Sequence, residues 1–179
     1  MKPELTIWIL TACLALVAGW ADFRTRKIPN WLTVPAVVAG ITLRTVLGGW
    51  PGAKASLEGL ALALGLLLPL VLLRALGAGD WKLMGAVGAF LGPLWFLIVL
   101  VGSIFVSGLM AMVEMARTRR VRETFRNLGV LVKGFFSFGL RVNPQISLDN
   151  PHLLKLPFGV AVAISTLALF CATRWGLWN

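Results

Sequence analysis

Charged residues are scarce in this sequence, and apolar residues dominate it. Asp, Glu, Lys and Arg make up 13% of the 179 residues, whereas 58% are hydrophobic. Soluble domains carry roughly 25% charged residues, so this composition excludes an ordinary soluble globular protein. We expect an all-α fold, a polytopic membrane helix bundle, organised as a single membrane domain over residues 1–179.

Side chains that bind metals or form disulfides are also scarce. Cys13 and Cys171 each lie alone in an apolar run, and no Cys-x-x-Cys pair occurs. This excludes a cysteine zinc site and a disulfide framework. His152 is the only histidine and lies in a loop, where lone histidines are usually solvated. We expect neither a metal nor a cofactor.

Tyrosine is absent, and eight tryptophans supply the amphipathic rings. Such rings favour the boundary between lipid and water. Most of them lie near the ends of apolar runs, and we predict that these mark the membrane interfaces: Trp8, Trp20, Trp31, Trp50, Trp81, Trp175 and Trp178.

Apolar stretches recur along the whole chain. They are Leu5–Trp20, Leu32–Leu47, Leu57–Leu73, Leu83–Val113 and Leu156–Thr173. As one helix, Leu83–Val113 would span about 46 Å, against a hydrocarbon core of about 30 Å. Gly92-Pro93 is the natural break within it. We therefore predict six segments, with a short one at Leu83–Leu91, which crosses fully or is re-entrant, and a full one at Leu94–Val113.

The net charge is +10, and the basic residues lie between the apolar runs. This placement favours membrane topology and contact with anionic lipid over nucleic-acid binding. If the basic groups at residues 24–27, 74–82 and 117–155 face the cytoplasm, the positive-inside rule is satisfied and both termini lie outside. The outer side then keeps Lys2, Arg44, Lys54 and Arg174.

The basic loop, about residues 114–155, is the only sizeable segment expected outside the membrane. Its apolar residues recur at helical spacing, with Arg and Lys between them. This pattern predicts a basic amphipathic helix on the inner leaflet.

Acidic residues number only seven. A carboxylate at the centre of a membrane helix costs about 2.5–3.5 kcal/mol, so the position of each is informative. Asp22 lies two residues after the first apolar run, and Asp80 three residues before Leu83. The predicted topology places both at the cytoplasmic membrane edge. Glu114 also follows an apolar run, and we interpret it as an interfacial charge.

Two carboxylates at one edge can form a catalytic pair. When they come close, like charge raises one pKa and the pair holds one proton near neutral pH. One carboxylate then activates water, while the other protonates the peptide carbonyl or the leaving amine. Asp22 and Asp80 are therefore candidates for the catalytic pair of a protease, whereas placement alone equally suits solvated loop acids, with Asp22 paired to Arg24 or Arg26.

The residues around the two acids support this interpretation. Gly77 and Gly79 precede Asp80, where they would permit unusual backbone angles and close approach of an extended substrate. Lys82 could tune the pair or position the substrate, or it could extend to the interface as a plain lysine. After Asp22, a proline restricts the chain, and Asn30 is a suitable N-cap for the next helix.

Three motifs carry a resemblance to a known family. Asp22 is followed after five residues by Ile28-Pro29-Asn30, Gly77-Ala78-Gly79-Asp80-Trp81-Lys82-Leu83 follows, and Leu156-Pro157-Phe158-Gly159 precedes the last helix. In this order the chain resembles type IV prepilin peptidases, members of the Gly-x-Gly-Asp aspartic proteases of membranes. One such motif alone would be a weak signal, whereas the set is strong.

The resemblance implies a bacterial inner-membrane aspartic endopeptidase with Asp22 and Asp80 as the catalytic pair. It implies cleavage of the short basic leader of a prepilin or pseudopilin at the cytoplasmic face, next to a Gly. Longer relatives carry a domain with paired Cys-x-x-Cys motifs and methylate the new terminus. This chain lacks those motifs, as in the short form of tight-adherence (Flp-type) pili, so we expect no methyltransferase activity.

Two other classes stay open at this stage. A small proton-coupled transporter would also use membrane carboxylates, although transporters tend to place them near the midplane and within repeats. A non-catalytic scaffold of the pilus assembly machinery is the other alternative. The sequence does not determine the particular substrate or the oligomeric state.

Overall fold

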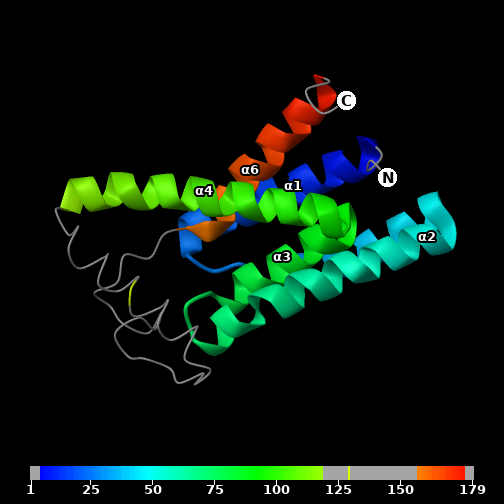
Figure 1. Ribbon diagram of the computed structural model, residues 1–179, viewed down its shortest axis with the longest axis horizontal. Helices are drawn as coiled ribbons and strands as arrows, with labels where there is room; N and C mark the ends of the chain where they lie inside the picture. The colour runs from blue at the N-terminus through cyan, green and yellow to red at the C-terminus, as the bar shows by residue number, and fades with distance from the viewer. Residues whose placement is uncertain (1–4, 119–128, 130–156, 176–179) are drawn as a thin grey trace.

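The computed structural model describes residues 5–118, 129 and 157–175. The regular elements in this part of the chain are all α-helices, which confirms the predicted all-α bundle (Figure 1). The predicted basic loop and its amphipathic helix lie outside the described residues, apart from the end of α4 and residue 129. In chain order the helices are α1 (Leu5–Thr25), α2 (Asn30–Leu72), α3 (Ala78–Leu91), α4 (Pro93–Thr118) and α6 (Phe158–Arg174).

Three of the described helices, α1, α2 and α4, are long and apolar enough to cross a membrane, and α6 is a shorter apolar helix. The helix α2 has 43 residues and would span about 65 Å if it were straight, more than twice the hydrocarbon core. It is broken at Gly49, whose φ of 58° and ψ of −147° are not helical. The two predicted segments in this region form its two arms, residues 30–48 and 50–72.

The arms of α2 fold back on each other and hold α3 between them. Gly40 in the first arm lies against the backbone of Phe90, and Gly59 in the second arm lies against Gly88. Near the start of α3, the Trp81 indole N–H donates to the Leu64 carbonyl at 2.9 Å. The first arm runs parallel to α3, because Asn30 contacts Lys82 and Gly40 contacts Phe90. The second arm runs antiparallel to it, because Gly59 contacts Gly88 and Leu64 contacts Trp81.

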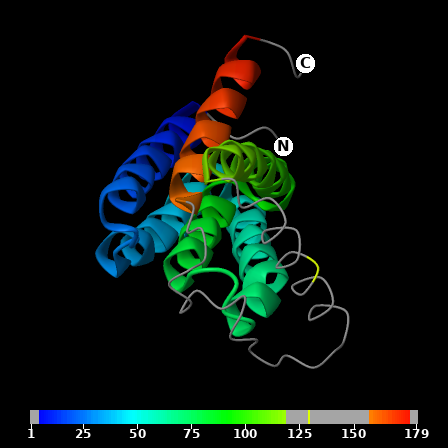
Figure 2. The ribbon, with the colours of Figure 1, turned by 90° about the vertical axis from the view of Figure 1, so that its left-hand side faces the viewer.

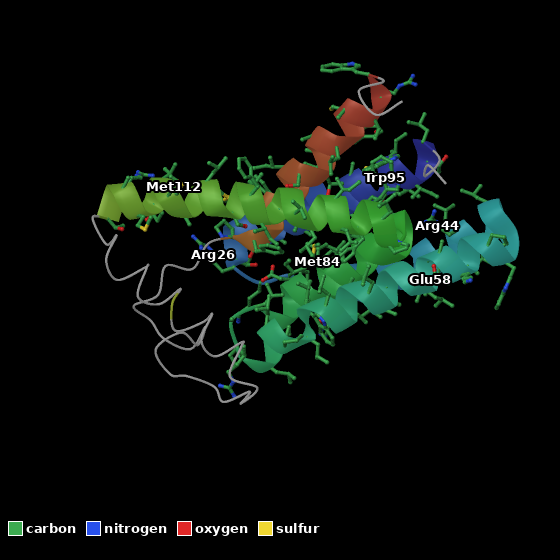
Figure 3. All side chains as sticks on the ribbon, in the orientation of Figure 1. Arg26, Arg44, Glu58, Met84, Trp95 and Met112 are labelled. Atoms are coloured by element: carbon green, nitrogen blue, oxygen red, sulfur yellow. The ribbon has the colours of Figure 1, made fainter. Side chains whose placement is uncertain are left out.

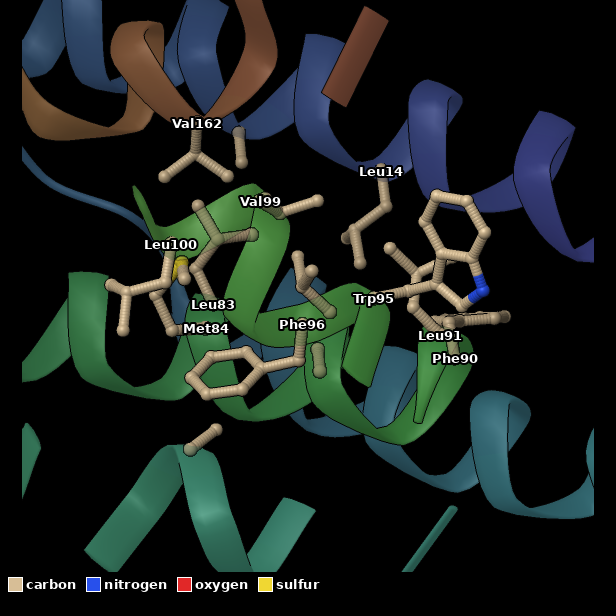
Figure 4. Packing of buried hydrophobic residues seen from close by; sticks show 14 of the residues in the cluster. Leu14, Leu83, Met84, Phe90, Leu91, Trp95, Phe96, Val99, Leu100 and Val162 are labelled. Carbon is tan, nitrogen blue, oxygen red and sulfur yellow. The ribbon is translucent and has the colours of Figure 1, made fainter. Parts of the chain in front are cut away.

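The helix α3 is the centre of the bundle. Its 14 residues span about 21 Å, less than the hydrocarbon core. Every residue of the predicted short segment, Leu83–Leu91, is buried. Its apolar side chains therefore contact other helices rather than lipid. Figure 4 shows its side chains packed with residues of three other helices: Leu14 of α1, Phe96, Val99 and Leu100 of α4, and Val162 of α6.

The break predicted at Gly92-Pro93 is confirmed. Gly92 has a φ of 79°, a left-handed conformation that glycine adopts without steric cost, and its N–H donates to Gly88 at 2.8 Å. Pro93 is the first residue of α4, a position where its missing N–H and fixed φ are favourable. The chain therefore reverses between α3 and α4.

The helices α1 and α6 lie side by side in opposite directions (Figure 2). Gly19 lies against Gly159 and Ala163, whereas the ring centroids of Trp8 and Phe170 are 6.3 Å apart. The start of α1 and the end of α6 therefore share one end of the bundle. The opposite end holds the C-terminus of α1 and the N-termini of α2, α3 and α6.

The tryptophans predicted to mark the interfaces differ in exposure. Trp8 is buried and lies edge-on to Trp95, with ring centroids 5.3 Å apart, so its ring faces other helices rather than lipid. Trp81 is half-buried because its indole is hydrogen-bonded to α2. Trp178 lies outside the described residues. Those with exposed rings are Trp20, Trp31, Trp50 and Trp175.

Candidate active site

Asp22 lies in the last turn of α1, at the point where the helix ends. Arg26, the first residue after the helix, has a φ of 54°, and its N–H donates to the Asp22 carbonyl at 2.8 Å. This is a helix C-terminus closed by a residue in the left-handed conformation. Pro29 then holds the chain extended, with φ −74° and ψ 143°, before α2 begins.

The side chain of Asp22 binds the N-terminus of α6. Asp22 is 7% exposed, and its Oδ2 accepts a hydrogen bond of 2.8 Å from the Gly159 N–H. Gly159 is in the first turn of α6, where N–H groups have no partner within the helix and the helix dipole favours an anion. A Cβ at Gly159 would lie 3.0 Å from the Asp22 Cβ, so glycine allows the two elements to approach.

Asp80 lies in the first turn of α3, and Gly77 is the N-cap residue. Its carboxylate accepts a hydrogen bond from the Gly77 N–H, the reciprocal half of a capping box. Its other oxygen, Oδ1, is buried and has no hydrogen-bond partner among the described residues. The carboxyl therefore has one oxygen bonded to its own helix and a second oxygen that is buried and unsatisfied.

Asp80 precedes the apolar segment 83–91 and lies outside the three helices long enough to cross a membrane. Burial raises the pKa of the Asp80 carboxyl to about 7, and the negative charge of Asp22 adds to the rise. The hydrogen bond from Gly77 opposes it. A carboxyl with this pKa can both hold and release a proton near neutral pH.

The structure brings Asp22 and Asp80 together in one pocket of about 300 Å³. The pocket lies at the end of the bundle where α1 ends and α3 begins. In Figure 3 the pocket residue Arg26 lies to the left of Met84, whereas Arg44 lies on the right-hand side of the bundle. The residues that line the pocket are Asp22, Arg26, Lys27, Ile28, Gly77, Ala78, Gly79 and Asp80.

Both predicted glycines line this pocket, where the lack of a side chain leaves space. A Cβ at Gly77 would lie 2.9 Å from Asp80 Oδ2, and one at Gly79 would lie 3.1 Å from the Ile28 Cβ. The expected unusual backbone angles are wrong: Gly77 has φ −68° and ψ 141°, and Gly79 has no positive φ. A side chain at either position would push against Asp80 or Ile28.

Lys82 does not line the pocket. Its Nζ donates to the Asn30 Oδ1 at 3.0 Å and so ties α3 to the start of α2. The predicted N-cap role of Asn30 is wrong, because Pro29 is the N-cap and no side chain caps this helix. The Asn30 amide is engaged by a residue 52 positions along the chain instead.

Several residues at the site had no predicted role there. Arg26, Lys27 and Ile28, which come a few residues after Asp22 in the first motif, line the pocket. Gly159 contacts Asp22 although it is 137 positions away. Gly159 belongs to the third motif, Leu156-Pro157-Phe158-Gly159, but the spacing of the motifs does not show that it contacts Asp22.

Among the described residues, no group of three His, Cys, Asp or Glu side chains could hold a metal ion.

The fold and the site together define a class of protein: a helical membrane protein with two carboxyl groups in one pocket at the end of its bundle. The model of the type IV leader peptidase family matches residues 9–112, which is more than half of the chain and includes both acids. The chain therefore belongs to the type IV leader peptidase family, which makes it a membrane peptidase. No significant match was found among curated proteins or among solved structures.

Proposed function

We propose that this protein is an aspartic endopeptidase that removes the basic leader from type IV prepilin-like proteins. One observation carries the proposal: Asp22 and Asp80, from the end of α1 and the start of α3, line the same pocket. The family match supports cleavage of leader peptides in general. We also propose that residues 1–179 form a single membrane domain that carries this reaction.

The two carboxylates can hydrolyse a peptide bond without another reactive group. One removes a proton from water as the water oxygen attacks the carbonyl carbon, and the other gives its proton to the carbonyl oxygen. When the tetrahedral intermediate collapses, the C–N bond breaks and the amine takes the first proton. The second carboxylate recovers its proton from the former carbonyl oxygen, so water is consumed and both acids return to their starting forms.

The distribution of charge supports cleavage at the cytoplasmic face of the bacterial inner membrane. The described Lys and Arg residues at the pocket end are Arg24, Arg26, Lys27, Arg74, Lys82 and Arg117, whereas the far end has Arg44, Lys54 and Arg174. The positive-inside rule then favours a cytoplasmic pocket and outward termini. The exposed Trp20 and Trp31 rings near the pocket suit the inner interface and contact with anionic lipid.

The test is co-expression with a prepilin, followed by the gel mobility of the substrate. Asp22→Asn and Asp80→Asn should each abolish leader removal, because each leaves a single carboxyl for a two-carboxyl reaction. Glu58→Gln is the matched control: Glu58 is exposed at the far end and lies near Lys54, with 3.8 Å between Oε1 and Nζ. It should process the prepilin as the unchanged protein does.

Other outcomes would identify the alternatives. A scaffold would tolerate both Asp→Asn changes without loss of pilus assembly. A transporter would leave the prepilin uncut whatever its own sequence. If the protein still processes the prepilin after either Asp→Asn change, the paired-acid mechanism is contradicted.

A further inference from the structure

The pocket of the acid pair lies between two stretches of chain. The end of α1 and the segment after it supply Asp22 and residues 26–28, and the start of α3 supplies residues 77–80. Each acid is bonded to a helix, Asp22 to the N-terminus of α6 and Asp80 to the N-cap residue of α3. The separation of the two carboxyl groups therefore depends on how the start of α3 is held against the segment that follows α1.

Two contacts hold the start of α3 against this segment. Gly79 packs on Ile28, since a Cβ at Gly79 would lie 3.1 Å from the Ile28 Cβ. Two residues further along the chain, the Asn30 Oδ1 accepts a hydrogen bond of 3.0 Å from the Lys82 Nζ. Gly79 and Lys82 are three positions apart and so share one face of α3. One contact would let α3 tilt against the segment, whereas two contacts almost a turn apart fix it.

Neither residue of the hydrogen-bonded pair has the role that its type usually has at such a position. An asparagine at the start of a helix usually caps it, but no side chain caps α2. A lysine at a membrane edge usually extends its amine into water, but that of Lys82 is bonded to an amide 52 positions away. Asn30 is exposed, and a single hydrogen bond at the surface adds little to stability. The main effect of the bond is therefore expected at the adjacent site.

We propose that Lys82 and Asn30 are a positioning pair, whose hydrogen bond holds the start of α3 at the distance that lets Asp80 and Asp22 act on the same water and peptide bond. Lys82 does not line the pocket, so this role differs from direct contact with the substrate. The proposal rests on the proposed function, because it concerns the spacing of the two acids in that reaction.

The test is steady-state cleavage of a synthetic prepilin leader peptide by the purified full-length protein in detergent. Lys82→Met keeps the apolar part of the side chain and removes the donor, whereas Asn30→Ala removes the acceptor. Each should lower kcat about tenfold or more, because a catalytic group displaced by about 1 Å can lose about 100-fold in rate. KM should stay the same, since neither residue touches the substrate.

The combination of the two changes separates the hydrogen bond from the charge of Lys82. If the bond is what matters, the double variant should be no slower than either single variant. Lys82→Arg keeps a donor and Asn30→Asp keeps an acceptor, so both should retain most of kcat. The matched control is Lys54→Met, which removes an exposed lysine at the far end of the bundle and should leave kcat and KM unchanged.

Three results would overturn the proposal. The first is an unchanged kcat in Asn30→Ala, because a lysine that acts through its charge is still present there. The second is a double variant in which the two single losses multiply. The third is a loss of kcat that follows a lowered thermal unfolding midpoint, because the bond would then act on the stability of the fold.

The unchanged protein distinguishes these results from failure of the proposed function. If it cleaves the peptide and any of the three results is found, the proposed function stands and the positioning pair is wrong. If it is folded by circular dichroism and cleaves nothing, the proposed function fails, and the positioning pair fails with it.

Discussion

The ionisation of single residues sets the conditions under which this site can work. A paired-carboxyl reaction needs one carboxylate to take a proton and one carboxyl to give a proton. Burial and the Asp22 charge raise the pKa of Asp80 to about 7, so the pair retains its shared proton below about pH 7. Because the two acids interact, a titration of the site would report a pKa of the pair and not of Asp80 alone.

We predict that cleavage activity declines as pH rises through about 7. The sign follows from the raised pKa of Asp80: the required proton is present below this value and is lost above it. The measurement is kcat/KM for leader cleavage between pH 5 and pH 9 in detergent, with circular dichroism at each pH to confirm that the helices persist. Activity that stays constant up to pH 9 with an intact fold would contradict the prediction.

Residue-level features differ in how well the sequence predicts them. Asp22, Asp80, Gly77 and Gly79 could be assigned to one site because each stands in a short motif at an expected membrane edge. The hydrogen bond from Gly159 to Asp22 could not, because it joins helices 137 positions apart. Such a contact depends on how α6 is rotated against α1, which local patterns do not determine.

Helices and turns also differ in how well the sequence predicts them. Gly92-Pro93 ends α3 through local chemistry, a positive φ followed by a proline, so the break was predictable. The sequence also marked Leu83–Leu91 as apolar, but apolar composition alone cannot distinguish contact with lipid from contact with protein. The packing of α3 between the arms of α2 and against α4 decides this, and all nine residues are buried.

The contact between α2 and α3 depends on small residues. Gly59 and Gly88 bring the two backbones together, and a Cβ at either glycine would collide with the carbonyl oxygen of the other. Near this contact, the Ser56 hydroxyl donates to the Ala89 carbonyl at 2.7 Å. Close backbone approach through small residues is a common means of helix association in membranes.

We predict that Gly59→Ala destabilises the protein by about 1–3 kcal/mol, the usual cost of overpacking, because the added methyl forces α2 and α3 apart. Gly65→Ala is the matched control in the same arm, since a Cβ there has nothing within 4 Å. It should be neutral or stabilising by up to about 1 kcal/mol, because alanine favours the helix. The check is the thermal unfolding midpoint of each variant in one detergent, and equal effects would show that the Gly59 contact is not restrictive.

For the whole molecule, the helix order fixes which segments share an end of the bundle. The pocket lies with the end of α1 and the starts of α3 and α6, whereas the Gly49 turn and the Gly92 turn lie at the other end. Arg44 belongs to this far end, where it is 4% exposed and lies against Gly92 rather than in solvent. Lys54, by contrast, has a side chain that is 68% exposed.

The orientation of the bundle can be tested with single cysteines. In a background where Cys13 and Cys171 are replaced by Ala, we predict that Lys54→Cys reacts with a membrane-impermeant maleimide on intact cells. Arg24→Cys, which is also exposed but lies at the pocket end, should react only after the inner membrane is permeabilised. The reason is the excess of basic residues at the pocket end, which the positive-inside rule assigns to the cytoplasm. Both variants must still process a prepilin, so that labelling reports the active orientation. The reverse labelling pattern would place the acid pair on the outer face, where it could not reach a leader that remains in the cytoplasm.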